Sequence, residues 1–203
     1  MVKIDFDFHV HTNYTDGVNS VAEIAERADL LGLRQILIPE HVRKKTGYVY
    51  SNLLSDIKDA NEKFKVRIIN GIEAKILDGN GTLDCPEEIL DNVKAIIGSV
   101  HTLPKNMDYS EAYESLIKSE CQIIGHPINL PPSLIPLVKK SKKILELNED
   151  YPLDLNFIRE CVENKIIFSV GSNAHNLDQI GNYSWVLNVV KKFSKEIKIW
   201  SIT

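Results

Sequence analysis

The chain has 203 residues, of which 43% are hydrophobic and 26% are charged, and its formal net charge is −4. This length and composition suit a single domain over residues 1–203 and exclude a collagenous, low-complexity or disordered chain. Acidic and basic residues are mixed along the sequence, so no basic surface for a nucleic acid duplex is predicted.

Short apolar strands alternate with amphipathic helices along the whole chain. The strands are predicted over residues 2–10, 35–39, 66–76, 94–100, 121–125, 143–148 and 165–172. The helices are predicted over about 20–31, 51–64, 86–90, 110–119, a proline-bounded stretch before residue 143, 153–164, and a last helix packed through Trp185, Val186, Val189 and Val190. Residues 78–84, DGNGTLD, are expected to form a hairpin, and 197–202, IKIWSI, a closing strand or tail.

Seven strands that alternate with helices are typical of a parallel sheet with helices outside. This number of strands suits a closed or nearly closed barrel better than an open sheet, so we predict an α/β fold of the (β/α)7 barrel type. In such barrels the chemistry lies at the carboxyl ends of the strands and in the loops that follow them.

Two features bear on where the protein works. Lys3, Asp5 and Asp7 interrupt the stretch where a signal peptide would need apolar residues, and the three cysteines form no Cys-x-x-Cys pair. An uncharged run over 121–138 contains several prolines and is predicted as a strand, a turn and a short helix rather than a membrane span. We therefore expect a cytoplasmic protein with no membrane partner.

The histidines share one position in the predicted fold. All six stand at the carboxyl end of a predicted strand, beside acidic or amide side chains. The candidate metal ligands are His9, His11, Asp16, His41, Glu73, His101, His126, Asn173 and His175. Imidazole and carboxylate groups bind Zn, Mn or Fe, and this set exceeds the needs of one ion. The sequence therefore predicts two or three divalent metal ions at one rim of the barrel.

The stretch DFHVHT explains how two histidines share one strand. Side chains two residues apart point to the same face, so His9 and His11 are expected to face the barrel interior, while Phe8 and Val10 face the helices. Asp7 has the same parity as the histidines. We expect its carboxylate to accept the second ring N–H of a metal-binding histidine and to fix the tautomer of that ring.

Taken in chain order, HVHT with Asp16, then PEH, GIEAK, GSVH, GHP and GSNAH resemble the motifs of the polymerase and histidinol phosphatase (PHP) family over residues 7–175. The resemblance implies a distorted (β/α)7 barrel, in agreement with the strand count. It implies a first metal at His9, His11, Glu73 and residue 173, a second at the bridging Glu73 with His101 and His126, and a third at Asp16, His41 and His175. The family usually has Asp where this chain has Asn173, and a neutral amide is a weaker ligand.

The chemistry that the resemblance implies is metal-dependent hydrolysis of a phosphoester, with a metal-bridging hydroxide as the nucleophile. Glu73 and Asp16 would take part in catalysis through the metals that they hold. Arg43, in the RKK that follows His41, is predicted to bind the substrate phosphate in a bidentate way, and Lys75 is the second candidate because it shares strand parity with Glu73.

The expected partner is a small phosphorylated metabolite, and histidinol phosphate is one possibility. Two alternatives remain open: a phosphoesterase or exonuclease that acts on a polynucleotide end, and a structural metal-binding domain whose activity is impaired by Asn173. The acidic charge balance and the absence of a polymerase sequence from these 203 residues favour the small substrate.

Overall fold

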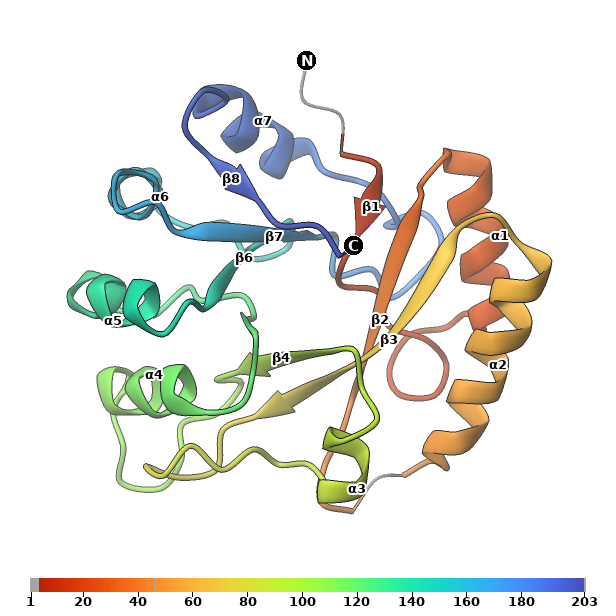
Figure 1. Ribbon diagram of the computed structural model, residues 1–203, viewed down its shortest axis with the longest axis horizontal. Coiled ribbons are helices and arrows are strands. Elements are labelled where there is room, and N and C mark those ends of the chain that lie inside the picture. The colour runs from red at the N-terminus through yellow and green to blue at the C-terminus, as the bar shows by residue number, and fades with distance from the viewer. Residues whose placement is uncertain (1–3, 46, 203) are drawn as a thin grey trace.

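The computed structural model describes residues 4–45 and 47–202, and their strands form one parallel eight-stranded sheet in sequence order (Figure 1). The strands are β1 (Phe6–Asp7), β2 (Gln35–His41), β3 (Arg67–Lys75), β4 (Ala95–Ser99), β5 (Ile123–Ile124), β6 (Ile144–Asn148), β7 (Ile167–Gly171) and β8 (Lys198–Ile199). The predicted α/β fold is confirmed, and all seven predicted strands are present. The eighth lies in the closing segment, where a strand or tail was predicted.

The helices cover the outer side of the curled sheet, as predicted (Figure 1). They are α1 (Val21–Leu31), α2 (Tyr50–Lys63), α3 (Glu87–Leu90), α4 (Tyr109–Lys118), the 3-10 turn η1 (Pro132–Leu134), α5 (Ile135–Lys140), α6 (Leu155–Glu163) and α7 (Ser184–Lys192). Helix α1 begins at the predicted capping box of Ser20 with Glu23 and ends at Gly32, whose φ of 70° suits glycine. Local capping signals therefore set the bounds of this helix.

Two clusters of buried side chains form the core. The smaller cluster packs α1 and α2 against β2 through residues such as Ile24, Ile38 and Leu53, and the larger one lies under the remaining helices. Val186, Val189 and Val190 of α7 are buried, as the spacing predicted. No helix among the described residues is long and apolar enough to cross a membrane.

The first strand is shorter than predicted, because only Phe6 and Asp7 pair regularly with β2, while residues 8–11 make separate hydrogen bonds to two segments. The Val10 N–H donates to the Leu37 carbonyl at 3.3 Å, while the Phe8 N–H donates to Val170 at 3.0 Å and the His11 N–H to Ala174 at 2.8 Å. Strand β8 pairs with the beginning of β7, at Ile167 and Phe168. Residues 8–11 therefore form their hydrogen bonds on this side with the end of β7 and the segment after it, from residue 170 onward. The sheet is closed into a distorted barrel at this seam, beside His9 and His11. Residues 2 and 3 of the predicted strand lie outside the described residues.

Candidate metal centre

The carboxyl ends of the strands surround one cavity of about 340 Å³. Its walls are formed by His11, Asp16, His41, Arg43, Glu73, His101, His126, Tyr151, Asn173 and His175. His9 is fully buried, with its Nε2 atom 3.0 Å from His11 Nε2. All nine residues that the sequence proposed as metal ligands therefore gather at one rim.

Glu73, near the end of β3, stands at the centre of the cluster and is 1% exposed. Its Oε1 atom lies 2.9 Å from His101 Nε2 and 2.8 Å from His126 Nε2. Its Oε2 atom lies 3.1 Å from His41 Nδ1 and 3.4 Å from His9 Nε2. One carboxylate thus faces four imidazoles, one at the end of β2 and three in the segments that follow β1, β4 and β5, which is the arrangement needed for a bridging ligand.

Asp16 lies at the outer side of the cluster, next to two of the histidines. Its Oδ2 atom lies 3.3 Å from His41 Nε2 and 3.4 Å from His175 Nε2, so the three residues that the resemblance grouped together are neighbours. The carbonyl oxygen of Asn173 lies 2.7 Å from His175 Nδ1. Donation from Nδ1 to this carbonyl leaves Nε2 of His175 free to face Asp16.

Glu40, at the end of β2, fixes the loop that carries Asp16. Its buried carboxylate accepts a hydrogen bond from the Thr12 N–H at 2.6 Å and another from the Thr15 hydroxyl. Burial raises the pKa of Glu40, while the bonds from Thr12 and Thr15 act in the opposite direction. This carboxylate therefore acts on the site by holding the backbone of residues 12–15 and not as a member of the cluster.

The cluster fits metal ions by a criterion independent of the sequence motifs. Within the cluster, the buried atoms His11 Nδ1, His41 Nδ1 and Glu73 Oε2 make no hydrogen bond, although His41 Nδ1 and Glu73 Oε2 lie 3.1 Å apart. Buried polar atoms without partners are costly and uncommon in folded proteins. The potential ligand atoms form three groups, and within each group they lie within 4.8 Å of one another. The groups are His9 with His11 and Glu73, His11 with Asp16 and His41, and His41 with Glu73 and His101. Divalent ions would satisfy these atoms.

The charges of the buried groups suit cation binding. Burial acts to raise the pKa of Glu73, but contacts with His101, His126 and His9 outweigh burial and hold that pKa well below its usual value. Burial, followed by the neighbouring His9, lowers the pKa of His11 well below its usual value. The centre therefore offers an ionised carboxylate next to a neutral imidazole, the forms in which both residues bind metals.

Glu146 of β6 is a residue of the site that the sequence reasoning missed. It is 1% exposed, with Oε1 lying 2.6 Å from His9 Nδ1. Its Oε2 atom accepts the N–H of His126 at 2.7 Å, and His126 has a φ of 28° that side-chain-bearing residues rarely adopt. The signal that could have revealed Glu146 is a carboxylate in the middle of the apolar strand ILELN.

The role predicted for Asp7 was wrong, because Glu146 takes it. The Asp7 carboxylate accepts hydrogen bonds from the Ser172 N–H at 2.9 Å, the Ser172 hydroxyl at 2.5 Å and the Gly181 N–H at 3.0 Å. It reaches His9 only at the backbone N–H, at 3.3 Å. Asp7 therefore holds the chain after β7, and the ring of His9 is oriented from across the barrel.

Replacing Glu146 with Gln is expected to weaken metal binding about 10- to 100-fold. Loss of the carboxylate that accepts the second ring N–H of a metal-binding histidine usually has an effect of this size. Burial opposes the ionised form of Glu146, but His9 outweighs it and lowers the pKa of Glu146, so the native residue is a carboxylate. Metal titration followed by calorimetry measures the change. Glu160→Gln, on the exposed face of α6, serves as the control; equal affinities for both variants would contradict the assignment.

Gly171, the last residue of β7, gives Glu146 and His9 the space that they occupy. A Cβ atom at this position would lie 2.5 Å from Glu146 Oε1 and 2.5 Å from His9 Cβ. Gly171→Ala is therefore expected to displace His9 and weaken metal binding by about tenfold or more. Gly79→Ala is the matched control, because its Cβ would meet only Ser115 Oγ at 4.0 Å. Metal content after gel filtration distinguishes the two variants, and a fully loaded Gly171→Ala protein would refute this reading.

The two cations predicted to bind phosphate both approach Asp84, but only one of them lines the cavity. Arg43 lines the cavity, with Nε lying 3.8 Å from Asp84 Oδ2 and Nη1 donating to the Val42 carbonyl at 2.7 Å. Lys75 Nζ lies 3.9 Å from the same Asp84 oxygen and is not among the residues lining the cavity. The predicted hairpin carries Asp84 and is closed by the antiparallel bridge of Ile76 with Leu83.

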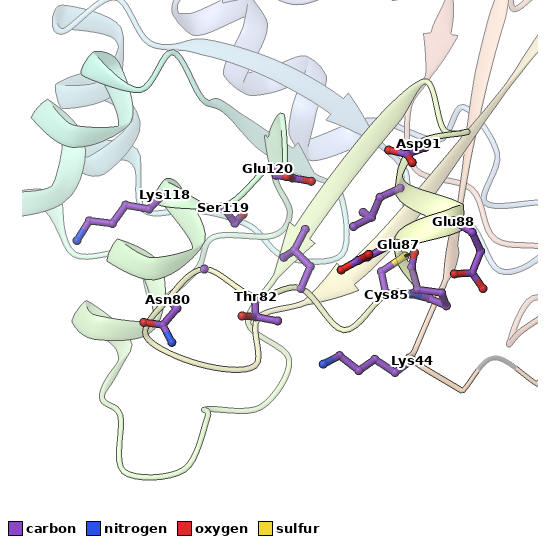
Figure 2. Close-up of a pocket in the computed structure, with 14 residues that line it drawn as sticks. Lys44, Asn80, Thr82, Cys85, Glu87, Glu88, Asp91, Lys118, Ser119 and Glu120 are labelled. Atoms are coloured by element: carbon purple, nitrogen blue, oxygen red, sulfur yellow. Dashed lines mark hydrogen bonds between the residues drawn. The ribbon is translucent and has the colours of Figure 1, made fainter.

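Lys44 points to a different hollow on the surface. Figure 2 shows this depression of about 870 Å³ between the hairpin, α3 and the end of α4. Its charged walls include Lys44 and Lys118 together with Glu87, Glu88 and Glu120. The N–H of Lys44 donates to Asp84 Oδ1 at 2.9 Å, which fixes the backbone after β2. Of the cations in the RKK stretch, Arg43 is therefore the one that lines the metal cavity.

Asn173 lies where the sequence placed it, but in a constrained conformation. Its φ is 59°, a region that asparagine tolerates better than most residues. Its Nδ2 atom donates to Asp150 Oδ2 at 3.3 Å. Its side chain lines the cavity and is therefore available as a neutral oxygen ligand.

A parallel α/β barrel whose rim gathers six imidazoles around a buried carboxylate defines a class of metal-binding barrel domains. The model of the PHP domain matches residues 7–150. The chain belongs to the PHP domain family.

Relatives and solved structures agree with this assignment. The chain is 27% identical to a protein named "Probable phosphatase" from Acetivibrio thermocellus over 94% of this chain and 88% of the relative. It is 26% identical to the DNA polymerase/3'-5' exonuclease PolX of Bacillus subtilis over 97% of this chain but only 38% of that protein. The crystal structure of a histidinol phosphate phosphatase from Lactococcus lactis, in complex with zinc, L-histidinol and phosphate, has a TM-score of 0.68 at 16% identity and covers 96% of this chain and 95% of that one.

Proposed function

We propose that this protein is a metal-dependent phosphoesterase that hydrolyses a small phosphorylated metabolite. The observation that carries the proposal is the cavity of about 340 Å³, in which the guanidinium of Arg43 stands beside eight candidate metal ligands. A cavity of this size admits a small molecule, and its walls combine cation binding with a donor for phosphate oxygens.

Two or three divalent ions, Zn, Mn or Fe, would be held at the three positions that the resemblance to the PHP family implies. His9, His11, Glu73 and Asn173 would form the first, Glu73 with His101 and His126 the second, and Asp16 with His41 and His175 the third. Such ions, when bound, polarise phosphoryl oxygens and lower the pKa of water. Asn173 brings no charge, so the first position is expected to bind more weakly than the others.

The side chains of this protein would prepare the substrate and the centre. Arg43 has five N–H donors, and its contacts with Asp84 and Val42 involve only two of its nitrogens, so it can bind phosphate oxygens as well. Glu146 keeps the ring of His9 in place, and Glu40 keeps the loop of Asp16 against the cavity. Glu73 and Asp16 supply the negative charge that holds the cations in position.

Arg43→Ala is expected to raise the KM for a phosphomonoester about tenfold or more, because a charge-assisted contact with phosphate is lost. The effect on kcat should be smaller if the contact is made equally to the bound substrate and to the transition state. Steady-state kinetics with metal-loaded protein measures both constants. Arg67→Ala, at the opposite end of β3, is the control; if both variants keep the native KM, Arg43 does not bind the phosphate.

The relatives support a small substrate. The protein from Acetivibrio thermocellus is named a phosphatase, and the structure from Lactococcus lactis holds L-histidinol and phosphate with zinc. Histidinol phosphate is therefore a candidate substrate. The similarity to PolX favours a second candidate, hydrolysis at a polynucleotide end.

A substrate panel tests the proposal. Metal-loaded protein is incubated with phosphomonoesters of small alcohols, including histidinol phosphate, and with single-stranded oligonucleotides that carry a free or phosphorylated 3' end. We expect phosphate release from one or more of the small esters, at a kcat/KM well above that for the oligonucleotides. Cleavage of oligonucleotides alone would favour the second candidate, and no turnover with any substrate at full metal occupancy would favour a structural role.

A further inference from the structure

Among the described residues that line the metal cavity, only Arg43 and Tyr151 are not candidate ligands. They come from opposite parts of the sheet, since Arg43 follows β2 and Tyr151 follows β6. The ring centroid of Tyr151 lies 5.0 Å from that of His126, and Tyr151 remains 40% exposed. The cavity therefore has one cationic wall and one aromatic wall, with the proposed metal positions between them.

The backbone holds Tyr151 firmly for a residue in a loop. Its N–H donates to the carbonyl of Asn148 at 3.3 Å, and the two residues form an antiparallel bridge. Asn148 is fully buried at the end of β6, and its Oδ1 atom also accepts the N–H of Asp150 at 3.1 Å. Pro152 follows with a fixed φ, and Leu153 is buried again. The backbone of Tyr151 is therefore held in place, and its aromatic ring stands at a defined position in the cavity wall.

Exposed apolar side chains continue from Tyr151 along the neighbouring loops. Ile128 follows His126 by two residues and is 51% exposed, and Leu103 follows His101 by two residues and is 39% exposed. The loops follow β4, β5 and β6, which are successive neighbours in the sheet. Single exposed apolar residues need no explanation, but three in the loops that follow adjacent strands, one of them lining the cavity, are consistent with an apolar contact surface on this side of the rim.

We propose that Tyr151 is a specificity-determining residue that selects phosphomonoesters whose alcohol carries a flat ring. The phosphate would lie at Arg43 and the metal positions, and the ring would pack against Tyr151 with Ile128 and Leu103 at the outer edge. Flat rings stack on an aromatic face, whereas puckered rings make poorer contact with it. This inference rests on the proposed function for the placement of the phosphate.

A matched pair of ligands tests the inference without requiring turnover. The probes are 2-phenylethylphosphonate and 2-cyclohexylethylphosphonate, which differ in the flatness of the ring but share the phosphonate and the linker. Calorimetry with metal-loaded native protein is expected to give about five- to tenfold tighter binding of the phenyl compound. The preference should persist in Tyr151→Phe and disappear in Tyr151→Leu. Tyr109→Leu, an exposed tyrosine that does not line the cavity, should keep the native preference.

Three results would overturn the inference: equal binding of the two phosphonates to native protein, no binding of either, or a ring preference that survives in Tyr151→Leu. Metal content is measured for each variant, so that a change in the centre is separated from a change in ring contact. Hydrolysis of the corresponding phosphate esters is measured in parallel. Ring-selective binding without hydrolysis would contradict the proposed function alone, while hydrolysis without ring selectivity would contradict the inference alone.

Discussion

Glu73→Gln is expected to reduce phosphoesterase turnover by about a thousandfold or more and to remove most of the bound metal. The amide keeps the size of the side chain but loses the negative charge that faces His9, His41, His101 and His126 at 2.8–3.4 Å. No other carboxylate among the described residues contacts all four imidazoles, so the loss cannot be compensated locally. Elemental analysis and steady-state kinetics on the same preparation measure the two effects together.

The control for Glu73→Gln is Glu160→Gln, which removes a carboxylate from an exposed helix position. Circular dichroism of both variants shows whether the barrel is intact. A folded Glu73→Gln protein with native metal content and turnover would exclude Glu73 as the bridging ligand, and with it the metal-centred function.

Removal of metal by a chelator is expected to abolish activity and to lower the thermal midpoint of unfolding. At a free metal concentration a thousand times the Kd, one ion contributes about 4 kcal/mol to the free energy of unfolding, and this contribution is lost in the apo protein. In the apo protein, His11 Nδ1, His41 Nδ1 and Glu73 Oε2 then remain buried without a hydrogen bond.

Scanning calorimetry before and after dialysis, followed by separate addition of Zn, Mn and Fe, tests this expectation. Recovery of both the midpoint and the turnover with at least one metal is the predicted outcome. An apo protein that is as stable and as active as the untreated protein would contradict it. Recovery of stability without activity would support a structural metal site.

The fold could be predicted because its signals are local. Apolar runs, capping residues such as Ser20 and the turn DGNGTLD marked the elements without knowledge of their neighbours. The gathering of the histidines could also be predicted, because parallel strands place their carboxyl ends at one rim. The short first strand could not be predicted, since its length depends on pairing with β2, which only Phe6 and Asp7 make regularly.

Contacts across the barrel could not be predicted from the sequence. Strand parity gave the face on which Asp7 and His9 stand, but not that Glu146, far along the chain, approaches the ring of His9. Arg43 and Lys75 carry the same charge and both approach Asp84, and only the structure shows that Arg43 lines the cavity while Lys75 does not. Tyr151 stands in a loop with no periodic pattern, so nothing in the sequence connected it with the cavity.

The seam of the barrel determines when the metal centre can form during synthesis of the chain. His9 and His11 belong to one edge of the seam, and Asn173 and His175 to the other, about 160 residues later in the chain. Chains are synthesised from the N-terminus, and early segments can fold before later ones appear. The first two histidines are therefore made long before their partners, and the centre cannot be completed until the ribosome has released the chain beyond β7. Like a disulfide between distant cysteines, a metal held across this seam would restrict the unfolded chain most because it closes a long loop.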